Sequence, residues 1–185
     1  MLYIVGGISR AGKSTLSRMI LEKHNIPYMS LDSIFMGYQN TFPELIKGKG
    51  YTDFVRADIM WPFIKGAIDH ILHMDQDYLI EGAFISPKNV NYLQQKFPEK
   101  IKACYIGYAE KDIEEKIEEI KRHNPPGDWL KGCSDEEIRN VVEVSKKFSS
   151  LVHKECTKYN IKWFDTSVDF FGTLELARRH LMEGK

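Results

Sequence analysis

Short apolar runs alternate with longer amphipathic segments along most of the chain. The runs fall at residues 2–5, 28–31, 78–80, 101–106 and 161–164. Each is almost continuously apolar, which is typical of strands that are buried on both faces. Because longer helical patterns separate the runs, the alternation predicts an α/β fold with a five-stranded parallel sheet and helices on both faces.

The segments between the strands predict several helices and one irregular stretch. Helical spacing of apolar residues is found at residues 13–24, 53–74, 87–97, 110–122, from 134 onward and at 173–182. Pro62 is expected to kink the second of these helices or to restart it after Trp61. Glycines and a proline interrupt residues 33–52, so short helix and loop are expected there.

The helix at 110–122 is the most highly charged of the set. Its predicted inner stripe is Ile113, Ile117 and Ile120. The i,i+4 pairs Asp112/Lys116 and Glu118/Arg122 predict that its charged residues form a solvated outer face.

Residues 7–14 spell G-x-x-x-x-G-K-S directly after the first apolar run. This strand–loop–helix context is that of a phosphate-binding P-loop, whereas the alternative is a glycine turn with a surface lysine. Lys13 would contact the β and γ phosphates, and the hydroxyl of Ser14 is a hard oxygen ligand suited to Mg²⁺. The expected nucleotide contacts are Gly7, Ile8, Ser9, Arg10, Ala11, Gly12, Lys13, Ser14 and Thr15.

Composition limits the classes of partner. The 185 residues include 26 basic and 26 acidic side chains, so no overall field favours nucleic acid or an anionic membrane. Three widely spaced cysteines favour neither a disulfide framework nor a structural zinc, which agrees with a reducing cytoplasm. These values predict a single cytoplasmic domain over 1–185, with no nucleic acid or membrane as its partner. We also expect a monomer or homodimer.

Acidic residues follow the strands that lead toward the P-loop. Asp32, Glu81 and Asp165 all come at predicted strand ends. Since ligands of parallel sheets bind beyond the carboxyl ends of the strands, one cleft is expected to gather these residues with the P-loop.

This arrangement resembles the small P-loop kinases, the group of shikimate, gluconate and adenylate kinases. The resemblance rests on the P-loop near the first residue, on Asp32 closing the strand in 28–32, and on a Pro- and Gly-rich segment at 123–133 in the position of that group's mobile lid. Residues 78–87 also resemble the third-strand region of proteins related to 2-phosphoglycerate kinase. The resemblance implies a P-loop NTPase fold with strand order 2-3-1-4-5, and the use of ATP and Mg²⁺.

The resemblance also suggests roles, each beside a plainer alternative. Asp32 is a candidate to accept the proton of an acceptor hydroxyl, or it is a helix N-cap. Glu81 is a candidate to orient a Mg²⁺-bound water or to meet the acceptor, or it is a surface carboxylate; Ser14 and Glu81 are the candidate metal ligands. Which of the two is the catalytic carboxylate stays open. Arg122 is a candidate to close over the γ-phosphate, or it pairs with Glu118.

The acceptor side is less specific. Arg56, Trp61 and Phe84 lie in segments expected to flank it, although both aromatic side chains are also read as core. The expected function is an ATP-dependent kinase that phosphorylates a hydroxyl of a small metabolite. The alternatives are a nucleoside monophosphate kinase, disfavoured by the few basic residues between the P-loop and the third strand, and a nucleotide-binding regulator or toxin-like protein of the same fold.

Overall fold

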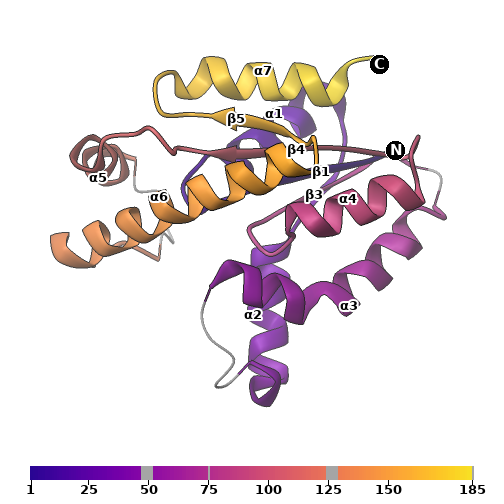
Figure 1. The fold of residues 1–185 in the computed structure, drawn as a ribbon, viewed down its shortest axis with the longest axis horizontal. Helices are drawn as coiled ribbons and strands as arrows, with labels where there is room; N and C mark the ends of the chain where they lie inside the picture. The colour runs from indigo at the N-terminus through magenta and orange to yellow at the C-terminus, as the bar shows by residue number, and fades with distance from the viewer. Residues whose placement is uncertain (47–51, 75, 124–128, 185) are drawn as a thin grey trace.

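One parallel sheet forms the centre of the structure (Figure 1). The computed structural model describes residues 1–46, 52–74, 76–123 and 129–184. The strands run in the order β2-β3-β1-β4-β5, which confirms both the parallel sheet and its predicted order. They are β1 (Leu2–Gly7), β2 (Tyr28–Ser30), β3 (Tyr78–Glu81), β4 (Ile101–Gly107) and β5 (Lys162–Asp165).

The central strand is β1, which pairs with β3 on one side and β4 on the other. All six of its residues are buried, as expected for a strand covered by helices on both faces. The register places Leu2 opposite both Tyr78 and Ile101. The first apolar run of the sequence therefore forms the most enclosed element of the fold.

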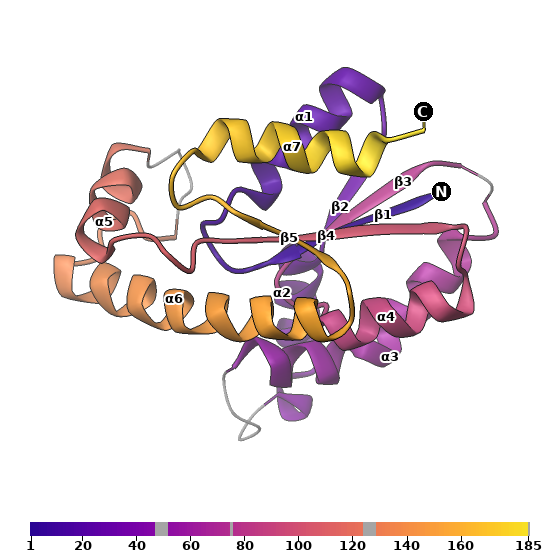
Figure 2. The same ribbon diagram turned by 45° about the horizontal axis from the view of Figure 1, so that its top comes forward.

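Helices cover both faces of the sheet (Figure 2). Helices α1 and α7 lie on one face, and α3, α4 and α6 lie on the other. The helices are α1 (Lys13–His24), α2 (Leu31–Thr41), α3 (Asp53–Ile71), α4 (Pro87–Lys96), α5 (Ile113–Arg122), α6 (Asp135–Lys158) and α7 (Phe170–Met182), with a 3₁₀ turn at Pro43–Leu45. Among the residues that the structure describes, no helix is long and apolar enough to cross a bilayer.

One expectation about a strand end is wrong, and of the two outcomes expected at Pro62 the restart does not occur. Strand β2 stops at Ser30 and α2 begins at Leu31, so Asp32 lies in the first turn of a helix and not at the end of a strand. Helix α3 continues through Pro62 without a restart, although a proline leaves one carbonyl of the preceding turn without its usual N–H donor.

A second, smaller apolar cluster joins α5 to α6. It consists of Ile117, Ile120, Leu130, Ile138 and Val142. The side chain of Leu130 is 1% exposed, so it ties the chain just before α6 to the two helices. A capping box formed by Ser134 and Glu137 begins α6. This cluster joins α5 to the first half of α6 beyond one end of the sheet (Figure 2).

Replacing Gly107 by alanine should destabilise the fold. A Cβ there would lie 2.0 Å from the ring of Trp163 and 2.4 Å from the hydroxyl of Ser149, so both side chains would have to shift. Overpacking of this kind costs about 1–3 kcal/mol. Urea denaturation measures it, with Gly37→Ala as the control. Gly37 lies in α2 with nothing within 4 Å of the added methyl, and alanine there should be neutral or stabilising by up to about 1 kcal/mol. Equal stability of the two variants would contradict the packing around Gly107.

Candidate active site

The loop from β1 to α1 has the backbone that a phosphate cradle needs. Gly7, Arg10 and Gly12 have φ angles of 130°, 61° and 105°. A Cβ on Gly7 would lie 2.0 Å from the carbonyl oxygen of Ile106, and one on Gly12 would lie 2.9 Å from the ring of Phe170. Gly12 is also the N-cap of α1 and makes no side-chain capping bond. The first N–H groups of α1 therefore lack a side-chain cap, which suits an anion.

Three polar side chains meet at this loop. The Nζ of Lys13 donates to the carbonyl of Ile8 at 2.8 Å, and the hydroxyl of Ser14 donates to Oε1 of Glu81 at 3.3 Å. Glu81 is only 2% exposed. The end of β3 thus places a carboxylate directly against the P-loop serine.

Glu81 has an unusual environment for a carboxylate. Its Oε2 is buried, and no hydrogen-bond partner for it lies in the described part of the chain. Burial raises its pKa, while Lys13 and hydrogen bonds from Ser30 and Ser14 oppose the shift. A hydroxyl and a carboxylate with a free oxygen form a donor set that fits Mg²⁺, so Ser14 and Glu81 are the residues that would hold this ion, either directly or through its waters.

Asp32 lies beside the same strand end. Its Oδ1 accepts a hydrogen bond from the backbone N–H of Ala83 at 3.2 Å, and its side chain is otherwise exposed. The residue at the N-cap of α2 is Ser30, so the reading of Asp32 as a helix cap is wrong. The bond to Ala83 brings Asp32 close to Glu81, as expected for a shared site, although it comes from a helix.

The guanidinium of Arg56 lies against two aromatic rings from distant parts of the chain. The guanidinium of Arg56 lies 5.4 Å from the ring centroid of Phe35 and 5.8 Å from that of Phe84, and these two rings are 4.5 Å apart. Its Nη1 is 3.8 Å from Oδ1 of Asp53. Phe84 is buried, which agrees with the core reading, but it also forms one wall around Arg56.

Asp53 is a site residue that the sequence analysis missed. Burial raises its pKa, and Arg56, Lys13 and Asp32 all act on its charge, so it belongs to the same electrostatic group. It is the first residue of α3, where an acidic side chain is an ordinary helix-start signal. No pattern in the sequence separates that structural role from a role in the site.

Lys116 corrects the prediction of a fully solvated charged helix. Its side chain is buried, with Nζ 4.6 Å from the ring centroid of Tyr108 and 3.2 Å from Oε2 of Glu119. Burial lowers the pKa of Lys116, and Glu119 opposes this shift. Asp112, its predicted partner, instead caps α5. Position 116 follows Ile113 by three residues and therefore lies on the inner stripe.

The candidate lid is described only in part. Residues 124–128 of the expected segment 123–133 lie outside the described residues. Arg122 is the exposed last residue of α5, and Glu118 pairs with Lys121 rather than with it. Beyond the gap, Trp129 is 62% exposed and its ring lies 5.8 Å from the guanidinium of Arg10. The chain after the gap thus returns to the P-loop.

The turn after β5 supports the same end of the sheet. The carboxylate of Asp165 accepts bonds from the N–H groups of Ala109 and Ser167, and the Thr166 hydroxyl donates to the carbonyl of Gly107. The carboxylate of Asp165 therefore stabilises the segments that follow β4 and β5.

Solved structures with the same architecture agree with this arrangement. A shikimate kinase from Bacteroides thetaiotaomicron superposes with a TM-score of 0.61 at 13% identity, covering 99% of this chain and 98% of its own. A gluconokinase from Sinorhizobium meliloti 1021 gives a TM-score of 0.60 at 12% identity, covering 97% and 90%. The chain has the fold of the small P-loop kinases.

Sequence comparison adds no closer assignment. No protein-family model matches the chain, and no curated protein matches it in sequence. An uncharacterized protein from Eubacterium ventriosum shares the fold at 13% identity, with a TM-score of 0.54 and 99% of both chains covered. At these identities the likeness concerns the fold, so the chemistry has to be argued from the residues themselves.

Asp53→Asn should remove one component of the dependence of stability on pH. Because the pKa of Asp53 is raised in the folded state, the folded state holds this proton more tightly than the unfolded one. The contribution of Asp53 to the free energy of unfolding should therefore fall as the pH rises from its unfolded-state pKa through its folded-state pKa. Asparagine does not titrate, so the variant should lack this decline, and its stability relative to the unmodified protein should rise over that range.

Thermal unfolding from about pH 3 to pH 7 measures this effect. The control is Asp58→Asn, an exposed aspartate on the same helix, which should keep the decline. Parallel curves for Asp53→Asn and the unmodified protein would contradict the assignment.

Proposed function

We propose that the protein is an ATP-dependent kinase that transfers the γ-phosphoryl group to a hydroxyl of a small metabolite. The observation that carries this proposal is the contact between Ser14 of the P-loop and the buried carboxylate of Glu81, whose second oxygen has no partner in the described chain. Lys13 acts on the same carboxylate, and the N–H of Ala83, two residues after Glu81, donates to Asp32. The groups proposed to bind the nucleotide therefore lie next to the carboxylate proposed to bind the acceptor.

The proposed step is an in-line displacement at the γ-phosphorus. The acceptor oxygen bonds to phosphorus, the bond from phosphorus to the β,γ-bridging oxygen breaks, and ADP leaves. The acceptor hydroxyl loses its proton to the carboxylate of Asp32, which is exposed beside Ala83 and so is open to an incoming ligand. Glu81, in contrast, is enclosed and faces Ser14, which suits it to the metal side.

The cationic groups would neutralise charge on the phosphates. Lys13 would exchange the carbonyl of Ile8 for phosphate oxygens, since a charged oxygen is the stronger acceptor. Ser14 and Glu81 would hold Mg²⁺, which would supply further charge neutralisation at the phosphates. Arg122 is the proposed mobile cation that closes on the γ-phosphate.

The acceptor would lie against Arg56 and Asp32. Arg56 offers donors beside the faces of Phe35 and Phe84, and Asp32 offers an acceptor, so a compound with several hydroxyls and one apolar face suits these groups. A mass-spectrometric screen for phosphorylated products across metabolite alcohols and nucleoside monophosphates would identify the class. Tight ATP binding with no product from any acceptor would favour a regulator.

Lys13→Ala should weaken ATP binding without unfolding the protein. It removes one charge-assisted contact to phosphate, worth roughly 1.5–3 kcal/mol or about ten- to hundredfold in affinity. Calorimetric titration with ATP and Mg²⁺ measures the change. The control is Lys23→Ala near the other end of α1, where the lysine pairs with Glu175. An unchanged affinity for ATP in a folded Lys13→Ala variant would contradict the assignment of residues 7–14 as a P-loop.

Asp32→Asn should lower kcat by about 10²-fold or more and leave ATP affinity nearly unchanged. Asparagine retains an oxygen that can accept the bond from Ala83, so the fold should persist, but it cannot take up the acceptor proton. Steady-state kinetics with the best acceptor from the screen measures the effect, with Asp58→Asn as the matched exposed control. Normal turnover in Asp32→Asn would transfer the catalytic role to another group.

A further inference from the structure

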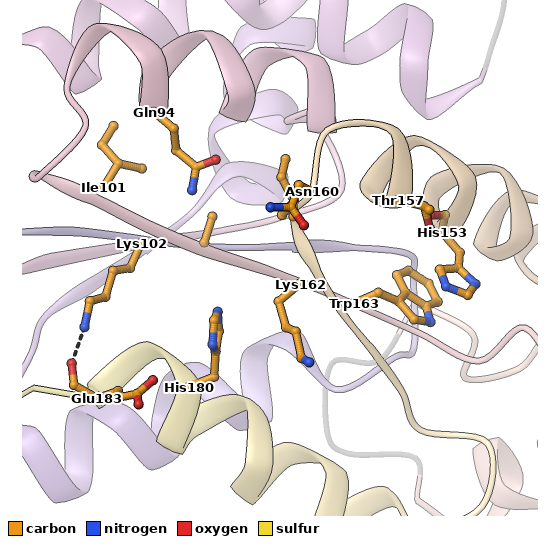
Figure 3. A pocket seen from close by; sticks show the side chains of 12 residues that line it. Gln94, Ile101, Lys102, His153, Thr157, Asn160, Lys162, Trp163, His180 and Glu183 are labelled. Carbon is orange, nitrogen blue, oxygen red and sulfur yellow. Dashed lines mark hydrogen bonds between the residues drawn. The ribbon is translucent and has the colours of Figure 1, made fainter.

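A hollow of about 680 Å³ lies at the far end of the sheet from the P-loop (Figure 3). It exists because β5 is shorter than β4: Cys104 is paired with Lys162, the first residue of β5, so Ile101, Lys102 and Ala103 extend past the end of that strand. Small-molecule sites have volumes of roughly 300–1,000 Å³, so the hollow is of suitable size. It is remote from every group assigned to phosphoryl transfer.

Side-chain nitrogens surround the opening. Figure 3 shows Gln94 reaching in from α4, Lys102 and Lys162 from the two strands, and His180 from α7. The side chain of Asn160, in the turn before β5, lies nearby. These five residues come from different segments of the chain and offer N–H donors from several sides.

The hollow has an excess of positive charge in a protein whose net charge is zero. The lining contains Lys102 and Lys162 but one carboxylate, that of Glu183. The described ion pairs include neither lysine: Lys162 is exposed, and Lys102 donates to the backbone carbonyl of Glu183. An ammonium has three donors, so Lys102 keeps two for another acceptor.

The neighbouring groups reduce this excess but do not reverse it. The carbonyl end of α7 would disfavour an anion, and part of the charge of Lys102 offsets it through its bond to Glu183. His180 donates to the carbonyl of Ala103, where the strand lacks a neighbour. Ile101 and Ile161 add an apolar wall. The site therefore combines two lysines, neutral amide donors and an apolar surface.

We propose that this hollow binds a small organic anion, with its carboxylate or phosphate oxygens held by Lys162 and Lys102, which lie on either side of His180 (Figure 3), and its carbon skeleton against Ile101 and Ile161. Gln94 and Asn160 would donate to the remaining oxygens. Both anionic groups present oxygens that accept charge-assisted hydrogen bonds, which is the chemistry this lining supplies. The site is separate from the P-loop and does not depend on kinase activity.

Nuclear magnetic resonance titration tests the proposal directly. The isotope-labelled protein is first saturated with a non-hydrolysable ATP analogue and Mg²⁺ to occupy the P-loop. Citrate and glycerol 3-phosphate are then added separately, with glycerol as the neutral control at matched ionic strength. We expect saturable shifts at residues lining the hollow with at least one anion and none with glycerol. The two anions distinguish a carboxylate from a phosphate preference.

Variants decide whether the lysines are responsible. Lys162→Gln should weaken the binding by about tenfold or more, because it removes a charge-assisted contact at an exposed position where folding is not at risk. Lys158→Gln, which replaces an exposed lysine outside the hollow that pairs with Glu155, should leave it unchanged. No saturable shift at the hollow below about 10 mM of either anion, or equal affinity in both variants, would overturn the proposal.

Discussion

The contact between Gly7 and the carbonyl of Ile106 determines where the P-loop leaves the sheet. These residues are paired at the ends of β1 and β4, and any side chain on Gly7 would collide with that carbonyl. The N–H of Ile8 still bonds to the same oxygen at 3.3 Å. At its other end the loop packs through Gly12 under the ring of Phe170. Because both ends of the loop are fixed by the body of the fold, its N–H groups are preorganised for an anion.

Glu81, in contrast to the P-loop, lies in a position that is unfavourable for an isolated carboxylate. Pairing of Val5 with Glu81 holds it at the end of β3, and burial leaves Oε2 without a partner in the described chain. Such a group is tolerated when the surrounding structure fixes it, and it is typical of functional sites. A cation would satisfy the free oxygen, which explains in physical terms why the fold places an acid there.

Much of the fold could be predicted because its signals are local. Strands buried on both faces give continuous apolar runs, and the motif at residues 7–14 needs a strand before it and a helix after it. Asp32 was misplaced because Leu31 continues an apolar run, whereas Ser30 starts a helix there. Lys116 was predicted to be solvated because it is charged, but its position three residues after Ile113 places it on the buried face of α5.

The acceptor side could be predicted only in part, because its geometry comes from segments distant in the sequence. Arg56 was a candidate, but its two aromatic neighbours come from α2 and from the loop after β3. The same holds for Asp53, whose relation to Lys13 and Asp32 follows from packing alone. A sequence motif identifies the phosphate-binding loop, whereas the side chains proposed to bind the acceptor have no fixed spacing in the sequence.

Helix α7 links the two ends of the sheet. Phe170, its first residue, packs against Gly12 of the P-loop, and His180 near its other end bonds at the hollow. The helix has 13 residues and so spans roughly 20 Å. An anion in the hollow would therefore not compete with a nucleotide for any shared side chain. A shift of α7 would connect the two sites, because Phe170 lies against Gly12 and His180 lies at the hollow.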